Sequence, residues 1–93
     1  MIVGICSIEL ILPGSGSLKD KRQVIKSLKD RLKQRFNISI AEVDDQDLWQ
    51  KAVLGVACVA NRKDHVNEVL DKVIGAIRGT PSVEIMDYRL ELL

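Results

Sequence analysis

The hydrophobic positions of this chain follow two alternating periods, and each change of period marks a new element. Residues 2–12 are rich in Ile, Leu and Val, and the turn sequence Pro13-Gly14-Ser15-Gly16 ends this run. Residues 18–35 then carry apolar side chains at helical spacing. These are Leu18, Ile25, Leu28 and Leu32, with Phe36 just beyond. The pattern predicts a strand and then a helix, for which Ser17 is the expected N-cap and Asp20 its partner three residues on.

The rest of the chain predicts two strands, a second helix and a last strand. Residues 38–43 alternate as a half-buried strand does, and residues 51–60 are apolar on both faces. Asn61 is the expected cap of the second helix, which Gly79 and Pro81 end. Its expected buried residues are Val66, Val69, Leu70, Val73 and Ile77. Residues 83–92 alternate again and predict the final strand.

This order of elements predicts a single α+β domain over residues 1–93. The expected fold is ferredoxin-like βαββαβ, with a four-stranded antiparallel sheet and two helices on one face. No apolar run approaches the ~20 residues of a membrane span, and the N-terminus lacks the basic start of a signal peptide. We therefore expect no membrane partner.

One sheet face of such a fold has no helix to cover it. In the two central strands the even-numbered residues would face the helices, and the odd-numbered ones would face away. Apolar residues on that second face are Val3, Ile5, Val53, Ala57 and Val59. An uncovered apolar face predicts that another copy packs on it, which makes a homo-oligomer, most simply a dimer, the expected state. The alternative is a monomer in which small residues such as Gly55 sit beneath longer neighbours.

Charge adds a candidate binding surface. Residues 17–35 hold eight basic residues against Asp20 and Asp30, a net charge of +6 in a chain whose total is +1. Five of them fall within a stripe roughly 80° wide on the predicted helix. This basic stripe is Lys19, Arg22, Lys26, Lys29 and Lys33. It could neutralise RNA phosphates without reading sequence; a solvated helix face and a site for an acidic protein are the alternatives.

A second, weaker anion site is expected at the first turn. Gly14, Gly16 and Ser17 precede a helix N-terminus, whose backbone N–H groups can hold an anion. Lys21 lies close to the apolar face of the helix, so it would either extend past the helix start or point into this turn. The turn lacks the spacing of a phosphate-binding loop, and its glycines are also explained by backbone conformation.

An acidic stretch follows the second strand and could in principle hold a divalent cation. Its members are Glu42, Asp44, Asp45 and Asp47. They lack the spacing of a calcium loop and have no histidine nearby, so we expect a solvated loop and no metal. Trp49, the only tryptophan, is expected to anchor this loop to the core or to a partner subunit and not to stack on nucleic acid.

No arrangement of residues predicts catalysis. His65 is the only histidine and is expected on the surface of the second helix, while Cys6 and Cys58 are expected as buried, reduced thiols. The central strands also lack the paired aromatic residues of sheet-based RNA recognition. We therefore predict no catalytic residues, no cofactor and no enzyme.

Three segments resemble the YlxP-like family of small uncharacterised bacterial proteins. They are Leu12-Pro13-Gly14 with Ser17-Leu18-Lys19-Asp20-Lys21-Arg22, the stretch Arg35-Phe36-Asn37-Ile38-Ser39-Ile40-Ala41-Glu42-Val43, and Asp47-Leu48-Trp49-Gln50-Lys51-Ala52-Val53-Leu54-Gly55. The resemblance implies a ferredoxin-like fold and a cytoplasmic location. Family members are neighbours, in genome order, of translation-initiation and ribosome-assembly factors, which implies ribosomal RNA or ribosomal proteins as partners.

The leading hypothesis is therefore a non-enzymatic, ribosome-associated accessory protein that binds RNA through the basic stripe. Two alternatives stay open. One is a homo-oligomeric module that binds a small ligand or has a regulatory role, and the other is a protein–protein adaptor.

Overall fold

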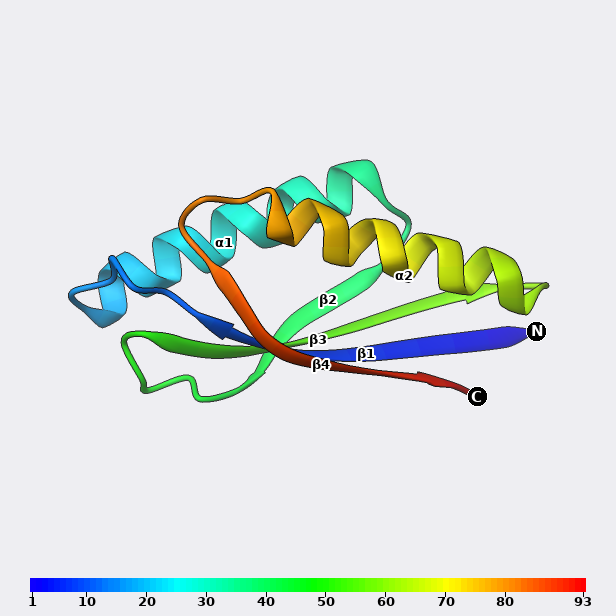
Figure 1. Ribbon diagram of the computed structural model, residues 1–93, viewed down its shortest axis with the longest axis horizontal. Coiled ribbons are helices and arrows are strands. Elements are labelled where there is room, and N and C mark those ends of the chain that lie inside the picture. Colours follow the sequence, from blue (N-terminus) through cyan, green and yellow to red (C-terminus); the bar gives the residue numbers. More distant parts are fainter.

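The computed structural model describes residues 1–93 and contains the six expected elements in the expected order (Figure 1). The strands are β1 (Ile2–Ile11), β2 (Ser39–Asp44), β3 (Lys51–Ala60) and β4 (Glu84–Leu92), and the helices are α1 (Leu18–Arg35) and α2 (Lys63–Arg78). The strands form one antiparallel sheet in the order β2-β3-β1-β4, and both helices cover the same face. The ferredoxin-like fold is confirmed.

The core lies between this sheet and the two helices. Strand register places Ile8 opposite Leu54 and Cys6 opposite Val56, so the even-numbered residues of β1 and β3 face the helices and are buried. Both cysteines are buried and free. Their burial raises the pKa of the Cys6 and Cys58 thiols, which disfavours the reactive thiolate.

The start of α1 is capped as expected. The hydroxyl of Ser17 accepts a hydrogen bond from the Asp20 N–H at 3.1 Å, and the Asp20 carboxylate accepts one from the Gly16 N–H at 3.1 Å. The helix ends at Arg35, and Phe36 is its C-cap, whose N–H bonds to the carbonyl of Leu32.

The start of α2 differs from the expectation. Arg62, not Asn61, is the N-cap, and no side chain caps the helix. Arg62 instead forms an ion pair with Asp64 in the first turn. The buried face is also shifted slightly, because Ile74 is buried while Val69 is only half-buried.

Gly4 determines how closely α2 can approach the sheet. A β-carbon at Gly4 would overlap the side chain of Val66 and would press on Leu70. Both of these α2 residues are completely buried. The missing side chain in β1 therefore sets the distance between β1 and the first two turns of α2.

Candidate nucleic-acid interface on helix α1

The basic stripe exists as a continuous feature of α1. Four of its residues are exposed, and Lys29 is half-buried at the border of the apolar face. Lys33 lies 14 positions after Lys19, which is about 21 Å along the helix. The stripe is thus long enough to contact several phosphates of one strand.

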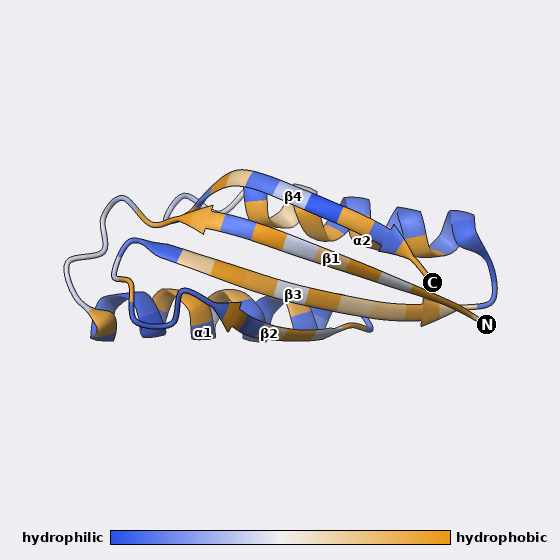
Figure 2. Ribbon diagram, turned by 90° about the horizontal axis from the view of Figure 1, so that it is seen from below, coloured by the Kyte–Doolittle hydropathy of each residue, from blue (hydrophilic) through white to orange (hydrophobic).

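The stripe faces away from α2. On the other flank of α1, Arg31 donates a hydrogen bond to the hydroxyl of Thr80, just beyond α2, at 3.4 Å. The stripe lies roughly 160° around the helix from Arg31, if ~100° separates successive residues. Figure 2 shows α1 on the β2 side of the sheet and α2 on the β4 side. The stripe is therefore on the outer flank of the fold, above the edge strand β2.

Three of the eight basic residues in this segment have other surroundings. Arg31 and Arg35 line a cavity of about 190 Å³ between the C-terminal ends of the helices, and Arg35 also lies over the Phe36 ring at 5.1 Å. The third, Lys21, is buried. The five residues that remain are those of the basic stripe.

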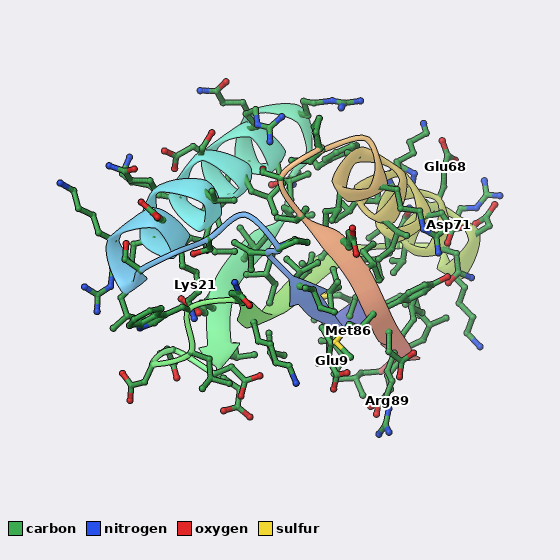
Figure 3. All side chains as sticks on the ribbon, turned by 60° about the vertical axis from the view of Figure 1, so that its left-hand side comes forward. Glu9, Lys21, Glu68, Asp71, Met86 and Arg89 are labelled. Carbon is green, nitrogen blue, oxygen red and sulfur yellow. The ribbon has the colours of Figure 1, made fainter.

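The burial of Lys21 contradicts both interpretations made from the sequence. Its ammonium group donates to the carbonyl oxygens of Asp45 at 2.6 Å and Lys51 at 2.9 Å, and forms an ion pair with Glu42 at 2.9 Å. The side chain is 0% exposed, so it neither extends to solvent nor points into the glycine turn. Figure 3 shows Lys21 below α1, directed toward the β2–β3 loop. Two of its protons are donated to carbonyl oxygens and its charge is compensated by Glu42, so this buried group is not placed to bind an external anion.

At the glycine turn, two of the N–H groups expected to bind an anion already have partners within the chain. The Asp20 carboxylate already accepts the Gly16 N–H, while Ser17 caps the helix and accepts the Asp20 N–H. An external anion would have to displace this internal carboxylate. Neither Gly14 nor Gly16 has a positive φ, so backbone conformation does not require glycine at either position.

The acidic stretch forms a loop that holds its own chain together. Glu42 pairs with Lys21, and the Asp44 carboxylate accepts the N–H of Asp45, which has a φ of 60°. No group of three acidic, histidine or cysteine side chains is placed to hold a metal ion. Trp49 is 55% exposed, so the expectation that it anchors the loop to the core is wrong. Its alternative role against a partner subunit stays a prediction.

Within the basic stripe there is one acidic neighbour. Asp30 accepts a hydrogen bond from Lys26 at 3.0 Å, and both side chains are more than half exposed. This hydrogen bond, together with the charges of Lys26, Lys33 and Lys29, holds the pKa of the Asp30 carboxyl below its usual value. Exposed pairs of this kind are weak, so a phosphate can compete with Asp30 for the lysine.

The fold and this surface define a small ferredoxin-like α+β domain with one basic helix flank. Residues 3–90 match the family model described as "Protein of unknown function (DUF503)". The chain is also 35% identical over 90 residues to "Uncharacterized protein YlxP" of Bacillus subtilis (strain 168), covering 97% of this chain and 98% of that protein. The protein belongs to this family, as the resemblance of its three segments indicated.

Solved structures support the fold alone. The de novo designed protein Foldit4 matches with a TM-score of 0.58 at 12% identity, covering 98% of this chain and 97% of the design. The de novo designed protein LFR1 1 with ferredoxin fold matches with a TM-score of 0.54 at 9% identity, covering 100% and 84% of the two chains. Neither helix of the present structure is long and apolar enough to cross a membrane.

Proposed function

We propose that the protein is a non-enzymatic accessory factor that binds ribosomal RNA, free or in ribosomal particles, through the basic stripe of α1. One observation carries this proposal: five basic side chains share the outer flank of α1, and a single carboxylate, Asp30, lies among them. Of the other basic residues of the segment, Lys21 is buried, whereas Arg31 and Arg35 are exposed and contact the neutral Thr80 hydroxyl and Phe36 ring. Five of the seven basic side chains that are not buried are thus concentrated on one flank.

Binding on such a surface consists of phosphate contacts. Each phosphate that a Lys or Arg neutralises releases counterions, so affinity falls with salt at a slope of about −0.9 per contact for duplexes and about −0.7 for single strands. Five contacts give a slope of about −3.5 to −4.5. The flank carries no aromatic side chain on which a base could stack. We therefore expect binding that depends strongly on salt and weakly on base sequence.

Charge reversal on the stripe tests the proposal. The variant Lys26→Glu/Lys29→Glu reverses two central charges, and Lys63→Glu/Lys72→Glu makes the same change on α2 as a matched control. Fluorescence anisotropy with a labelled ribosomal RNA fragment, over about 50 to 300 mM salt, gives affinity and slope. We expect the stripe variant to lose at least tenfold in affinity and about 1.5 in slope, and the control to lose much less.

Folding and the competing interpretation are checked in the same experiment. Circular dichroism should show unchanged helix content, because Lys26 is exposed and Lys29 lies only at the border of the core. Equal losses in the two variants, or a wild-type affinity without a salt slope, would contradict the proposal. Co-sedimentation with ribosomal subunits that the stripe variant loses, without any affinity for naked RNA, would instead identify an acidic protein as the partner of α1.

A further inference from the structure

The sheet face that the helices leave uncovered is divided into an apolar part and a charged border. On β1, β2 and β3 the outward residues include the polar Ser7, Glu9 and Ser39, but most are apolar. The larger apolar side chains there are Val3, Ile5, Val43, Val53 and Val59. We call this set the open apolar face. The border follows β4, where Asp87, Arg89 and Glu91 point the same way. Figure 2 shows the contrast between a largely hydrophobic β3 and hydrophilic stretches in β4.

The open apolar face is exposed and hollow in its middle. Val59 and Val43 are 55% and 54% exposed, and a depression of about 270 Å³ is lined in part by Ala57 and Val43, whose side chain lies over Gly55. Figure 1 shows the β2–β3 loop curling away from the helices, on the same side as this face. That loop carries Trp49, which is 55% exposed. Large apolar side chains that are exposed together on one face indicate a surface that binds another molecule.

We propose that a second copy of this chain covers the face, with the two sheets packed face to face about a two-fold axis that crosses the strands. Along β3 the outward residues are Val53, Gly55, Ala57 and Val59, large at the ends and small in the middle. An axis between Gly55 and Ala57 overlays the outward residues of β3 on themselves, and in β1 it sets Ile5 against Ser7 and Val3 against Glu9 of the other copy. It sets Val53 of one copy against Val59 of the other.

The charged border agrees with the same axis. Strand β1 lies between β3 and β4. Its Ser7 is paired with Gly55 on one side and Arg89 on the other, so these residues lie in one row across the sheet. Ile5 is paired in the same way with Ala57 and Glu91. The axis therefore passes between Arg89 and Glu91 and places each Arg89 opposite Glu91 of the other copy. Neither residue forms an ion pair within its own chain. This self-complementarity favours a second copy over an unrelated protein.

The available area agrees with a dimer that uses the entire face. The four strands, six to ten residues long, cover roughly 550 Å² in each copy. Two copies then bury about 1,100 Å², close to the lower limit of about 1,200 Å² for a stable interface. In this arrangement Val53 of one copy lies over Val59 of the other. The β2–β3 loop with Trp49 precedes Val53 in the chain, so it extends past Val59 of the other copy and adds to the contact. The basic stripes lie on the opposite, helical sides of the dimer and stay free.

Sedimentation velocity over about 1 to 200 µM protein tests the state of the chain, with an expected micromolar dissociation constant. Val59→Glu should weaken the dimer at least tenfold, whereas Gln23→Glu, the same change of charge on exposed α1, should leave it unchanged. Emission from Trp49, the only tryptophan, should shift to shorter wavelength as the dimer forms. A wild-type chain that stays monomeric throughout would overturn the proposal and leave the RNA proposal untouched.

A charge swap tests the register and does not depend on a core substitution. Arg89→Glu and Glu91→Arg should each weaken the dimer about tenfold by facing like charges, and the double variant should restore it. Both residues are exposed in the single chain, so each variant should fold. A dimer that neither single variant weakens, or that the double variant fails to restore, would overturn this arrangement of the two copies.

Discussion

Replacing Lys21 by methionine should destabilise the protein strongly, although it removes only one of eight basic residues from the first helical segment. Methionine keeps the length and the apolar part of the side chain, so the change isolates the ammonium group. That group is 0% exposed and contacts three oxygens, from Glu42, Asp45 and Lys51. Without it, two carbonyl groups lose their donor and the Glu42 carboxylate loses its ion-pair partner, in a place where water has little access.

The size of the effect follows from these partners. Removing one member of a buried ion pair costs about 3 to 5 kcal/mol, because the other charge is left without compensation. The Glu42 side chain is 16% exposed and so keeps some hydration, which places the expected loss near the lower end, about 3 kcal/mol. A 93-residue domain has about 5 to 14 kcal/mol of stability. The melting temperature should therefore fall by about 12 to 24 °C.

Urea unfolding of a double-mutant cycle measures this directly. The cycle uses Lys21→Met, Glu42→Gln and the double variant, with Lys33→Met as a control for the loss of an exposed lysine from α1. In the methionine background, Glu42→Gln removes the uncompensated charge, so we expect a coupling energy above 1 kcal/mol. A loss below about 0.5 kcal/mol in Lys21→Met, or equal losses in Lys21→Met and the control, would refute the reasoning. RNA affinity should stay unchanged in Lys21→Met, since this ammonium group is not on the stripe.

Two further predictions use single substitutions. Gly4→Ala should lower stability by about 1 to 3 kcal/mol in urea unfolding, because the added methyl group overlaps Val66 of α2; an unchanged stability would show that α2 can move away freely. Asp30→Asn should raise RNA affinity about two- to fivefold in the anisotropy assay, because it frees Lys26 and removes the only carboxylate on the stripe; unchanged or weaker binding would argue against phosphate contacts at this position.

The elements and the core could be predicted because they depend on local patterns. The bounds 51–60 of the third strand and the Ser17 cap agree with the structure, and so does the burial of both cysteines. The cap of α2 could not be predicted in the same way. Asn61 has a side chain that favours capping, but Arg62 becomes the N-cap and pairs with Asp64, and the two positions differ by one residue.

The partners of Lys21 were beyond the reach of local patterns for a different reason. Its angular position beside the apolar face was visible in the sequence. Its two carbonyl acceptors, however, are 24 and 30 residues away, and backbone carbonyls leave no mark in a sequence. Glu42 appeared as one of four clustered acids, which suggested a solvated loop. Only the packing of α1 over the β2–β3 hairpin shows that one of these acids compensates a buried cation.

The structure therefore shows that the basic residues of α1 do not all have the same role. The net charge of +6 in residues 17–35 includes one buried lysine, Lys21, whose charge Glu42 compensates inside the fold, and seven basic residues that are exposed or half-buried. Lys21 and Lys26 differ in this way, although they are five residues apart on the same helix. A charge-reversal scan of α1 without this distinction would mix unfolding with loss of binding. The two predictions use different assays and can therefore be refuted independently. An unchanged stability of Lys21→Met would show that the role assigned to the buried lysine is wrong. An unchanged RNA affinity of Lys26→Glu/Lys29→Glu would show that the role assigned to the exposed basic stripe is wrong.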